Sequence, residues 1–156
     1  MDMWQLNQLE IRIADFGCGD MQFANFFCEE LQKKVQEKPQ LAETKFFIHA
    51  FDLSPNEIPI SEQLKKSEQI RIETHPGVSC GNSKEFQEES FDYIVCTLAL
   101  FGNEDSWKDT IQTAFFALKT NGLFILAEWD KYLPPKIAQK LSPAGVECIH
   151  FEPGKI

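Results

Sequence analysis

The sequence predicts a single α/β domain over residues 1–156, with a mostly parallel central sheet of about six strands and helices on both faces. Short apolar runs alternate with amphipathic segments along the chain, which is the pattern of repeated strand–helix units. The run at 91–100 is almost continuously apolar, as expected for a central parallel strand covered on both sides. With 156 residues, 43% of them hydrophobic, the chain is long enough for one core and too short for two ordinary domains.

The first strand–helix unit has a glycine turn at its centre. A strand is expected over 11–15, ending in Asp15, and Gly17 and Gly19 follow directly. We expect Asp20 to be the N-cap of a helix over 22–37, and Pro39 to end that helix. The apolar positions of this segment have helical spacing, at 23, 24, 27, 28, 31 and 35.

The glycine turn predicts a ligand site. Glycine can adopt φ > 0 and lets a ligand approach the backbone closely, next to the N–H groups that begin the helix. A dinucleotide fingerprint needs a third glycine where Gln22 stands, so NAD is disfavoured. Asp15 with only two close glycines suits a ligand that has a cationic end and lacks a pyrophosphate. The alternative is a plain strand–turn–helix junction without a ligand.

A second acidic residue, Asp52, ends the next expected strand, which covers 46–53. An acid at the tip of the second strand binds ribose hydroxyls in dinucleotide sites. Ser54-Pro55 directly after it supports the alternative, an ordinary turn or capping residue. A helix is then expected over 60–68, a short strand over 70–73 and a polar loop over 76–83.

The second half of the chain continues the alternation. We expect a strand over 91–100, a helix over 106–119, a turn at 120–122 and a strand over 123–127. A short helix ending at Leu141 and a last strand over 146–151 complete the sheet, with the C-terminal hairpin reduced. The exposed edge of this sheet would be available to a protein partner.

Four segments resemble the nucleolar rRNA-processing methyltransferases related to nucleomethylin. They are Ala14-Asp-Phe-Gly-Cys-Gly-Asp20, Phe51-Asp-Leu53, the run 91–102 and the run 117–128. The resemblance extends from about residue 11 to residue 146. It implies a Rossmann-like class I methyltransferase fold, S-adenosylmethionine as cofactor and methylation of adenine N1 in large-subunit rRNA. It also implies an intracellular location, the nucleolus in a eukaryote and otherwise the cytoplasm.

The resemblance also implies a set of cofactor contacts. The turn and its neighbours would hold the methionine part, the tip of the second strand would hold the ribose, and the end of the fourth strand would line the site. The residues concerned are Asp15, Gly17, Cys18, Gly19, Asp52, Leu53 and Thr97. The family's acidic residue and Met that contact adenine are absent from the segment 73–80, where His75 and Ser79 are the possible substitutes.

No residue stands out as catalytic, and no metal site is predicted. Five cysteines without a C-x-x-C pair indicate reduced thiols rather than a disulfide framework or zinc site. Cys96 lies where some methyltransferases place a nucleophile. The alternative is that Cys96 is a buried cysteine in a strand. Trp107 and Trp129 could stack on a substrate base, and the alternative is that they pack at the edge of the domain. Glu128 and Asp130 could be general bases, and the alternative is that they are ordinary solvated acids.

The charge conflicts with direct RNA binding. The chain carries 15 Lys and Arg against 24 Asp and Glu, a net charge of −9, whereas basic side chains provide most of the affinity for a phosphate backbone. The longest basic clusters are the pairs Lys33-Lys34 and Lys65-Lys66, and both are expected on solvated helix faces. An RNA substrate would therefore need help from another chain or region. The longest apolar run, 94–101, is far shorter than the ~20 residues of a membrane span.

Three hypotheses follow. The first is an S-adenosylmethionine-dependent methyltransferase. The second is a non-catalytic binding module on a methyltransferase fold, favoured by the acidic charge and the altered adenine contact. The third is an NAD-dependent oxidoreductase, which Gln22 disfavours.

Overall fold

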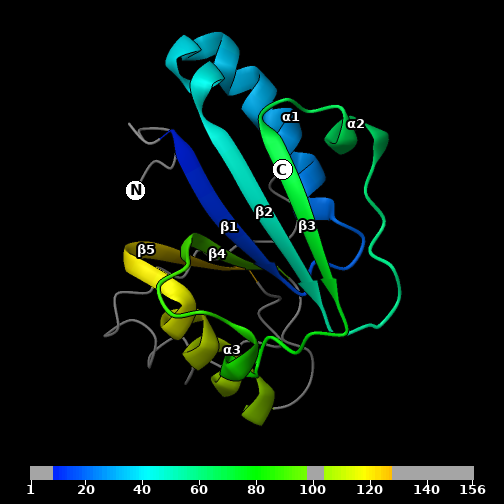
Figure 1. Cartoon of the computed structure of the whole chain (residues 1–156), viewed down its shortest axis with the longest axis vertical. Helices are drawn as coiled ribbons and strands as arrows, with labels where there is room; N and C mark the ends of the chain where they lie inside the picture. The colour runs from blue at the N-terminus through cyan, green and yellow to red at the C-terminus, as the bar shows by residue number, and fades with distance from the viewer. Residues whose placement is uncertain (1–8, 98–103, 128–156) are drawn as a thin grey trace, which may run out of the picture.

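Within the residues that the structure describes, the central sheet contains five parallel strands in the order β3-β2-β1-β4-β5 (Figure 1). The computed structural model describes residues 9–97 and 104–127, with side chains over 9–97 and 108–127. The strands are β1 (Glu10–Phe16), β2 (Lys45–Asp52), β3 (Ile70–Pro76), β4 (Phe91–Thr97) and β5 (Leu118–Ala127). The predicted α/β class and parallel sheet are confirmed, and the expected last strand over 146–151 lies outside the described residues.

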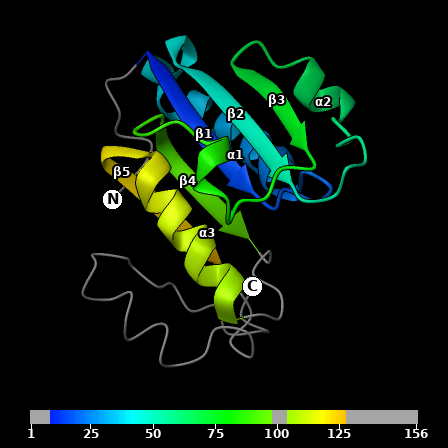
Figure 2. The ribbon, with the colours of Figure 1, turned by 60° about the horizontal axis from the view of Figure 1, so that its bottom comes forward.

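Helices pack on both faces of this sheet, as predicted (Figure 2). On one face, α1 (Gln22–Glu37) and α2 (Glu62–Lys65) bury Phe27, Leu31 and Leu64 against the strands. On the other face, α3 (Glu104–Ala117) packs through residues such as Ile111 and Ala114. Because both faces are covered, the inner strands are apolar on both sides.

Helix α1 has the bounds that its apolar spacing predicts, and its stripe faces the sheet. Pro39 begins a short 3₁₀ segment, η1 (Pro39–Glu43), where α1 has ended. The expectation that Asp20 is the N-cap is wrong. Met21 occupies the cap position in a left-handed conformation with φ 66°, and the Asp20 carboxylate accepts a hydrogen bond from Gln22 Nε2 at 3.1 Å. The fully buried Met21 side chain holds the chain in this conformation, and Asp20 lies outside in solvent.

Several elements differ in extent from the expectation. Helix α2 is only one turn, capped by the Ser61 hydroxyl, which accepts from Leu64 N. Strand β3 runs on to Pro76 because its last residues pair with the end of β2. The turn expected at 120–122 is a bulge inside β5, where Asn121 has φ 67° and the register with β4 shifts between Phe91 and Tyr93.

Several expectations fall on parts that the structure does not describe. Helix α3 begins two residues before its expected start. The side chain of Trp107, a residue of this helix, lies outside the described residues. Glu128, Trp129, Asp130 and the C-terminal segment also lie outside them. None of the described helices has the length and apolar character needed to cross a membrane.

Candidate functional site

The predicted site residues gather where β1, β2 and β4 end. The strands β1 to β5 are parallel to one another, so their carboxyl ends meet at one edge of the sheet (Figure 1). The chain order reverses at β1, which lies between β2 and β4, and open α/β sheets bind ligands at such a switch point. A candidate ligand site is therefore expected beside the loop that follows β1.

The glycine turn after β1 is anchored to β2. Gly17 N and Cys18 N both donate to Phe51 O, at 2.9 and 3.0 Å. Gly17 and Gly19 have φ 72° and 51°, which is the left-handed region that glycine adopts without strain. A Cβ on Gly19 would meet no atom within 4 Å. The turn is thus rigidly held on its inner side and open on its outer side.

Asp52 joins this turn to the end of β2. Its Oδ2 accepts from Gly19 N at 2.9 Å, and its Oδ1 accepts from Ser54 N at 2.8 Å. The hydrogen bond from Ser54 N is the contact of an ordinary turn residue, the alternative role that the sequence analysis gave for Asp52. A carboxylate has about four acceptor positions, so about two of them remain for hydroxyl groups of a ligand.

Asp15 is the most unusual group of the site. Its side chain is fully buried, and neither carboxylate oxygen has a hydrogen-bond partner within the described chain. Burial, followed by the nearby charge of Asp52, raises the pKa of Asp15 from 3.8 to about 7. A buried ionised carboxylate is costly unless it is paired, so this position is suited to a cationic group supplied from outside.

Two thiols lie close to these carboxylates. Burial is the main cause that raises the pKa of Cys18 and of Cys80 to about 12, and the charges of Asp15 and Asp52 raise both further. Both cysteines therefore remain neutral thiols near pH 7 and are poor nucleophiles. Sequence reasoning missed Cys80; the only signal was its place in the loop after β3.

The remaining predicted residues differ in their surroundings. The register places Cys96 beside Phe16, so Thr97 follows at the level of the glycine turn and is half-buried. Leu53 is 71% exposed directly after Asp52. Cys96 is buried in the core under α3, which agrees with the structural rather than the nucleophilic interpretation. Of the two substitutes for the adenine contact, Ser79 is exposed in the loop after β3.

The other of those two, His75, stacks on the ring of Phe51 with centroids 4.3 Å apart. It thus lies on the face of the sheet near the end of β3 rather than in the loop. The sequence alone did not indicate this position, because it depends on β3 being longer than its apolar run.

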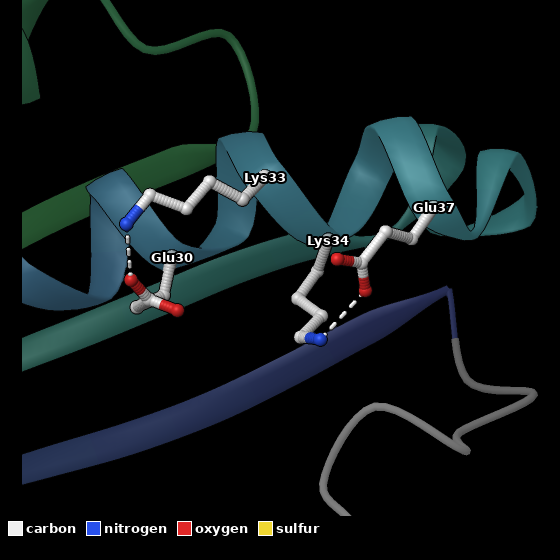
Figure 3. A network of polar contacts seen from close by, with 4 residues as sticks. All are labelled: Glu30, Lys33, Lys34 and Glu37. Carbon is white, nitrogen blue, oxygen red and sulfur yellow. Dashed lines mark hydrogen bonds and ion pairs between the residues drawn. The ribbon is translucent and has the colours of Figure 1, made fainter.

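Three of the four paired lysines, Lys33, Lys34 and Lys65, make ion pairs on helix surfaces, and Lys66 is the C-cap of α2. Figure 3 shows Lys33 bound to Glu30 at 2.7 Å and Lys34 bound to Glu37 at 2.6 Å along α1. Lys65 makes the same kind of contact with Glu62 at 3.0 Å. Each of these cations is partly neutralised by an acid on its own helix, which weakens it as a phosphate contact.

Comparisons with known proteins agree with this fold. A family model described as a methyltransferase domain matches residues 1–152. Similar solved structures include the trans-methyltransferase CalH in complex with SAH, at 15% identity and a TM-score of 0.55. The CurJ carbon methyltransferase is 16% identical with a TM-score of 0.53, and MNMC2 from Aquifex aeolicus is 17% identical with a TM-score of 0.51.

These solved structures are longer than the chain. The alignments cover 95%, 84% and 76% of this chain, but only 43%, 33% and 42% of CalH, CurJ and MNMC2 respectively. At sequence identities of 15–17%, the similarity to these structures shows a shared fold. No curated protein sequence matched the chain.

Proposed function

Because the chain belongs to the methyltransferase-domain family, we propose that it binds S-adenosylmethionine at the carboxyl ends of β1, β2 and β4 and transfers its methyl group. The observation that carries this proposal is the buried Asp15 carboxylate, which has no partner within the described chain and lies beside an open glycine turn. The CalH neighbour, solved with SAH, adds support from the fold. The bound cofactor supplies a methyl group on a cationic sulfur, which a nucleophilic atom of the acceptor attacks.

The charges of the site fit this cofactor. Its methionine part carries an ammonium group, and Asp15 would accept hydrogen bonds from it. Pairing with this cation would lower the pKa of Asp15 from its raised value and remove the cost of burying the charge. Asp52 strengthens the negative potential at the same place. No phosphate is present in such a ligand, which agrees with the exposed acid Asp20 at the start of α1.

The remaining contacts follow from the turn and the strand ends. The backbone of Gly17, Cys18 and Gly19 would lie against the methionine part, since the outer side of the turn is open. Asp52, with acceptor positions to spare, would bind ribose hydroxyls. Exposed Leu53 would cover the ligand beside it, and Thr97 would line the site from β4.

Calorimetric titration with S-adenosylmethionine and S-adenosylhomocysteine tests this proposal, with NAD as the control ligand. We expect micromolar binding of the first two and none of NAD. Asp52→Ala should weaken binding at least tenfold, because a hydrogen bond to a charged group contributes about 1.5–3 kcal/mol. An Asp109→Asn variant, which removes an exposed charge on α3, should bind like the parent chain.

Gly19→Ala is the second variant, because Asp52 also supports the fold through its two backbone hydrogen bonds. Its methyl group meets no protein atom, so the folding cost is limited to the left-handed backbone, about 1–2 kcal/mol. The same methyl group would occupy space that the ligand needs, and binding should be lost. An absence of binding by the parent chain up to millimolar ligand would contradict the proposal.

For the acceptor, we propose adenine N1 of ribosomal RNA, on the resemblance of the segments around Asp15 and Asp52, with a nucleolar location in a eukaryote. The net charge of −9 means that another chain would hold the RNA, and an exposed edge of the sheet is the place proposed for it. Transfer of a labelled methyl group to large-subunit rRNA, followed by mapping of the modified base, tests this acceptor.

The same acidic charge favours a second candidate function, a binding module that has lost methyl transfer. Cofactor affinity that persists without transfer to RNA, protein or small molecules would support this second candidate. An NAD-dependent oxidoreductase has no support from the family match.

A further inference from the structure

Two histidines and a glutamate meet on the sheet face that carries α3. The register pairs His49 of β2 with Glu73 of β3, and Phe51 with His75, so the three polar side chains are neighbours on one face. Helix α3 contacts β5 and η2 (Ser83–Glu85) and lies to one side of β2 and β3 in Figure 2. The side chains of His49, His75 and Glu73 are accordingly 12%, 26% and 65% exposed.

The polar atoms of these three residues lie close enough together to converge on one metal ion. His49 Nδ1 lies 3.3 Å from His75 Nε2 and 3.5 Å from Glu73 Oε2, and His75 Nε2 lies 3.7 Å from Glu73 Oε1. Ligand atoms bound tetrahedrally to zinc at about 2.0–2.1 Å are about 3.3 Å apart. One donor atom from each residue lies within 4.8 Å of the others, and rotation of the exposed Glu73 side chain would close the set further.

The cluster is also held in place before any metal binds. The His75 ring stacks on the Phe51 ring with centroids 4.3 Å apart and an interplanar angle of 12°, and the His49 ring lies nearly parallel to it, with centroids 5.5 Å apart and an angle of 14°. Without a metal, one imidazole N–H holds the two rings together.

We propose that His49, Glu73 and His75 form a binding site for Zn²⁺ or a similar divalent transition metal, with a fourth position left for water or another ligand. Two imidazoles and one carboxylate are a donor set that zinc and its neighbours in the first transition row accept, whereas magnesium and calcium prefer oxygen ligands alone. Such a site would fasten β3 to β2 at the end of the sheet that adjoins the glycine turn. This inference stands independently of the proposed methyl transfer.

Arg12 disfavours metal binding at this cluster. Its Nη2 lies 3.3 Å from His49 Nε2. When Nδ1 binds a metal, the neutral imidazole carries its proton on Nε2, so two donors would face each other there. Arg12 must therefore turn away when a metal binds, and Arg12→Met should tighten binding several-fold.

Titration with Co²⁺ alone, followed by visible absorption, tests the site. We expect one cobalt per chain, the intense visible bands of tetrahedral cobalt and displacement by Zn²⁺. Glu73→Gln should weaken binding at least about tenfold while the far-ultraviolet circular dichroism stays unchanged, because this side chain is mostly exposed. Glu57→Gln, at an exposed loop position, is the matched control and should bind like the parent chain.

Two outcomes would overturn the proposal. One is an unchanged cobalt affinity in Glu73→Gln and in the His49→Ala/His75→Ala double variant. The other is a sulfur-to-cobalt charge-transfer band in the near ultraviolet, which would assign the metal to cysteines such as Cys18 and Cys80. In the supported case, Zn²⁺ raises the melting temperature of the parent chain and of Glu57→Gln but much less that of Glu73→Gln.

Discussion

At the residue scale, the buried carboxylate of Asp15 makes the stability of the folded chain depend on pH. Its carboxylate is fully buried without a hydrogen-bond partner in the described chain, and burial with the Asp52 charge raises its pKa to about 7. In the unfolded chain the same carboxyl ionises near pH 4. Between these values the folded state holds the proton and the unfolded state does not, so the free energy of unfolding decreases as pH rises from about 4 to about 7.

Asp15→Asn should therefore stabilise the chain in the absence of ligand. Asn resembles the protonated acid in shape and stays neutral, so the gain should approach about 4 kcal/mol at pH 8 and be about 2–3 kcal/mol smaller at pH 5. Urea denaturation at the two pH values measures this difference. The same variant should lose affinity for S-adenosylmethionine, because the amide cannot pair with an ammonium group.

Asp109→Asn serves as the control, since it removes a carboxylate of the same kind at an exposed position. Its stability should follow the parent chain at both pH values. An Asp15→Asn variant that is less stable than the parent at pH 8 would contradict the destabilising role of the buried carboxylate.

At the scale of elements, the packing of α1 on the sheet separates two neighbouring phenylalanines. Phe27 is 3% exposed and meets the ring of Phe46 edge-on, with centroids 5.1 Å apart. Phe26, its neighbour along the helix, is 62% exposed. The helical period of 3.6 residues separates the two side chains by about 100°, so one faces β2 and the other faces solvent.

This pair of residues allows a matched test. Phe27→Ala should lower the free energy of unfolding by about 3–5 kcal/mol, because it leaves a cavity between α1 and β2. Phe26→Ala should change it by less than about 0.5 kcal/mol, since an exposed ring loses little contact. Urea denaturation of both variants measures the difference. Equal losses in the two variants would mean that α1 does not turn Phe27 toward β2 and Phe26 toward solvent.

At the scale of the whole molecule, the charge sets what the chain can hold by itself. Its net charge is −9. The Lys33 and Lys34 ammonium groups are bound by acids on α1 (Figure 3), and the Lys65 ammonium group is bound by Glu62 on α2. A phosphate backbone is held by cations that release its counterions, and an acidic surface opposes that contact.

The chain alone should accordingly bind RNA weakly. For an RNA hairpin with an unpaired adenine, we expect a Kd weaker than about 0.1 mM at physiological salt, which is the weak end of non-specific binding. Fluorescence anisotropy at low and at physiological salt measures this affinity. Micromolar binding that weakens steeply with salt would show that the chain holds RNA without a partner.

The local patterns of the sequence were sufficient for the parts of the molecule that depend on neighbours in the chain. The apolar spacing of 22–37 predicted α1, because a helix repeats every 3.6 residues. The glycines before it and the acids Asp15 and Asp52 marked the candidate site, since both acids end apolar strands. The parallel strands then bring these two acids to the same edge of the sheet.

Contacts between distant segments could be decided only by the tertiary structure. The meeting of His49, Glu73 and His75 depends on the register of β2 and β3, which no local pattern specifies. Cys80 comes near Asp15 for the same reason, and the buried Met21 took the cap position expected for Asp20. The sequence by itself determined which residues form the elements and the turn, through periodicity and glycine. The structure decided which side chains share a site, because strand register and burial arise only when the whole core packs.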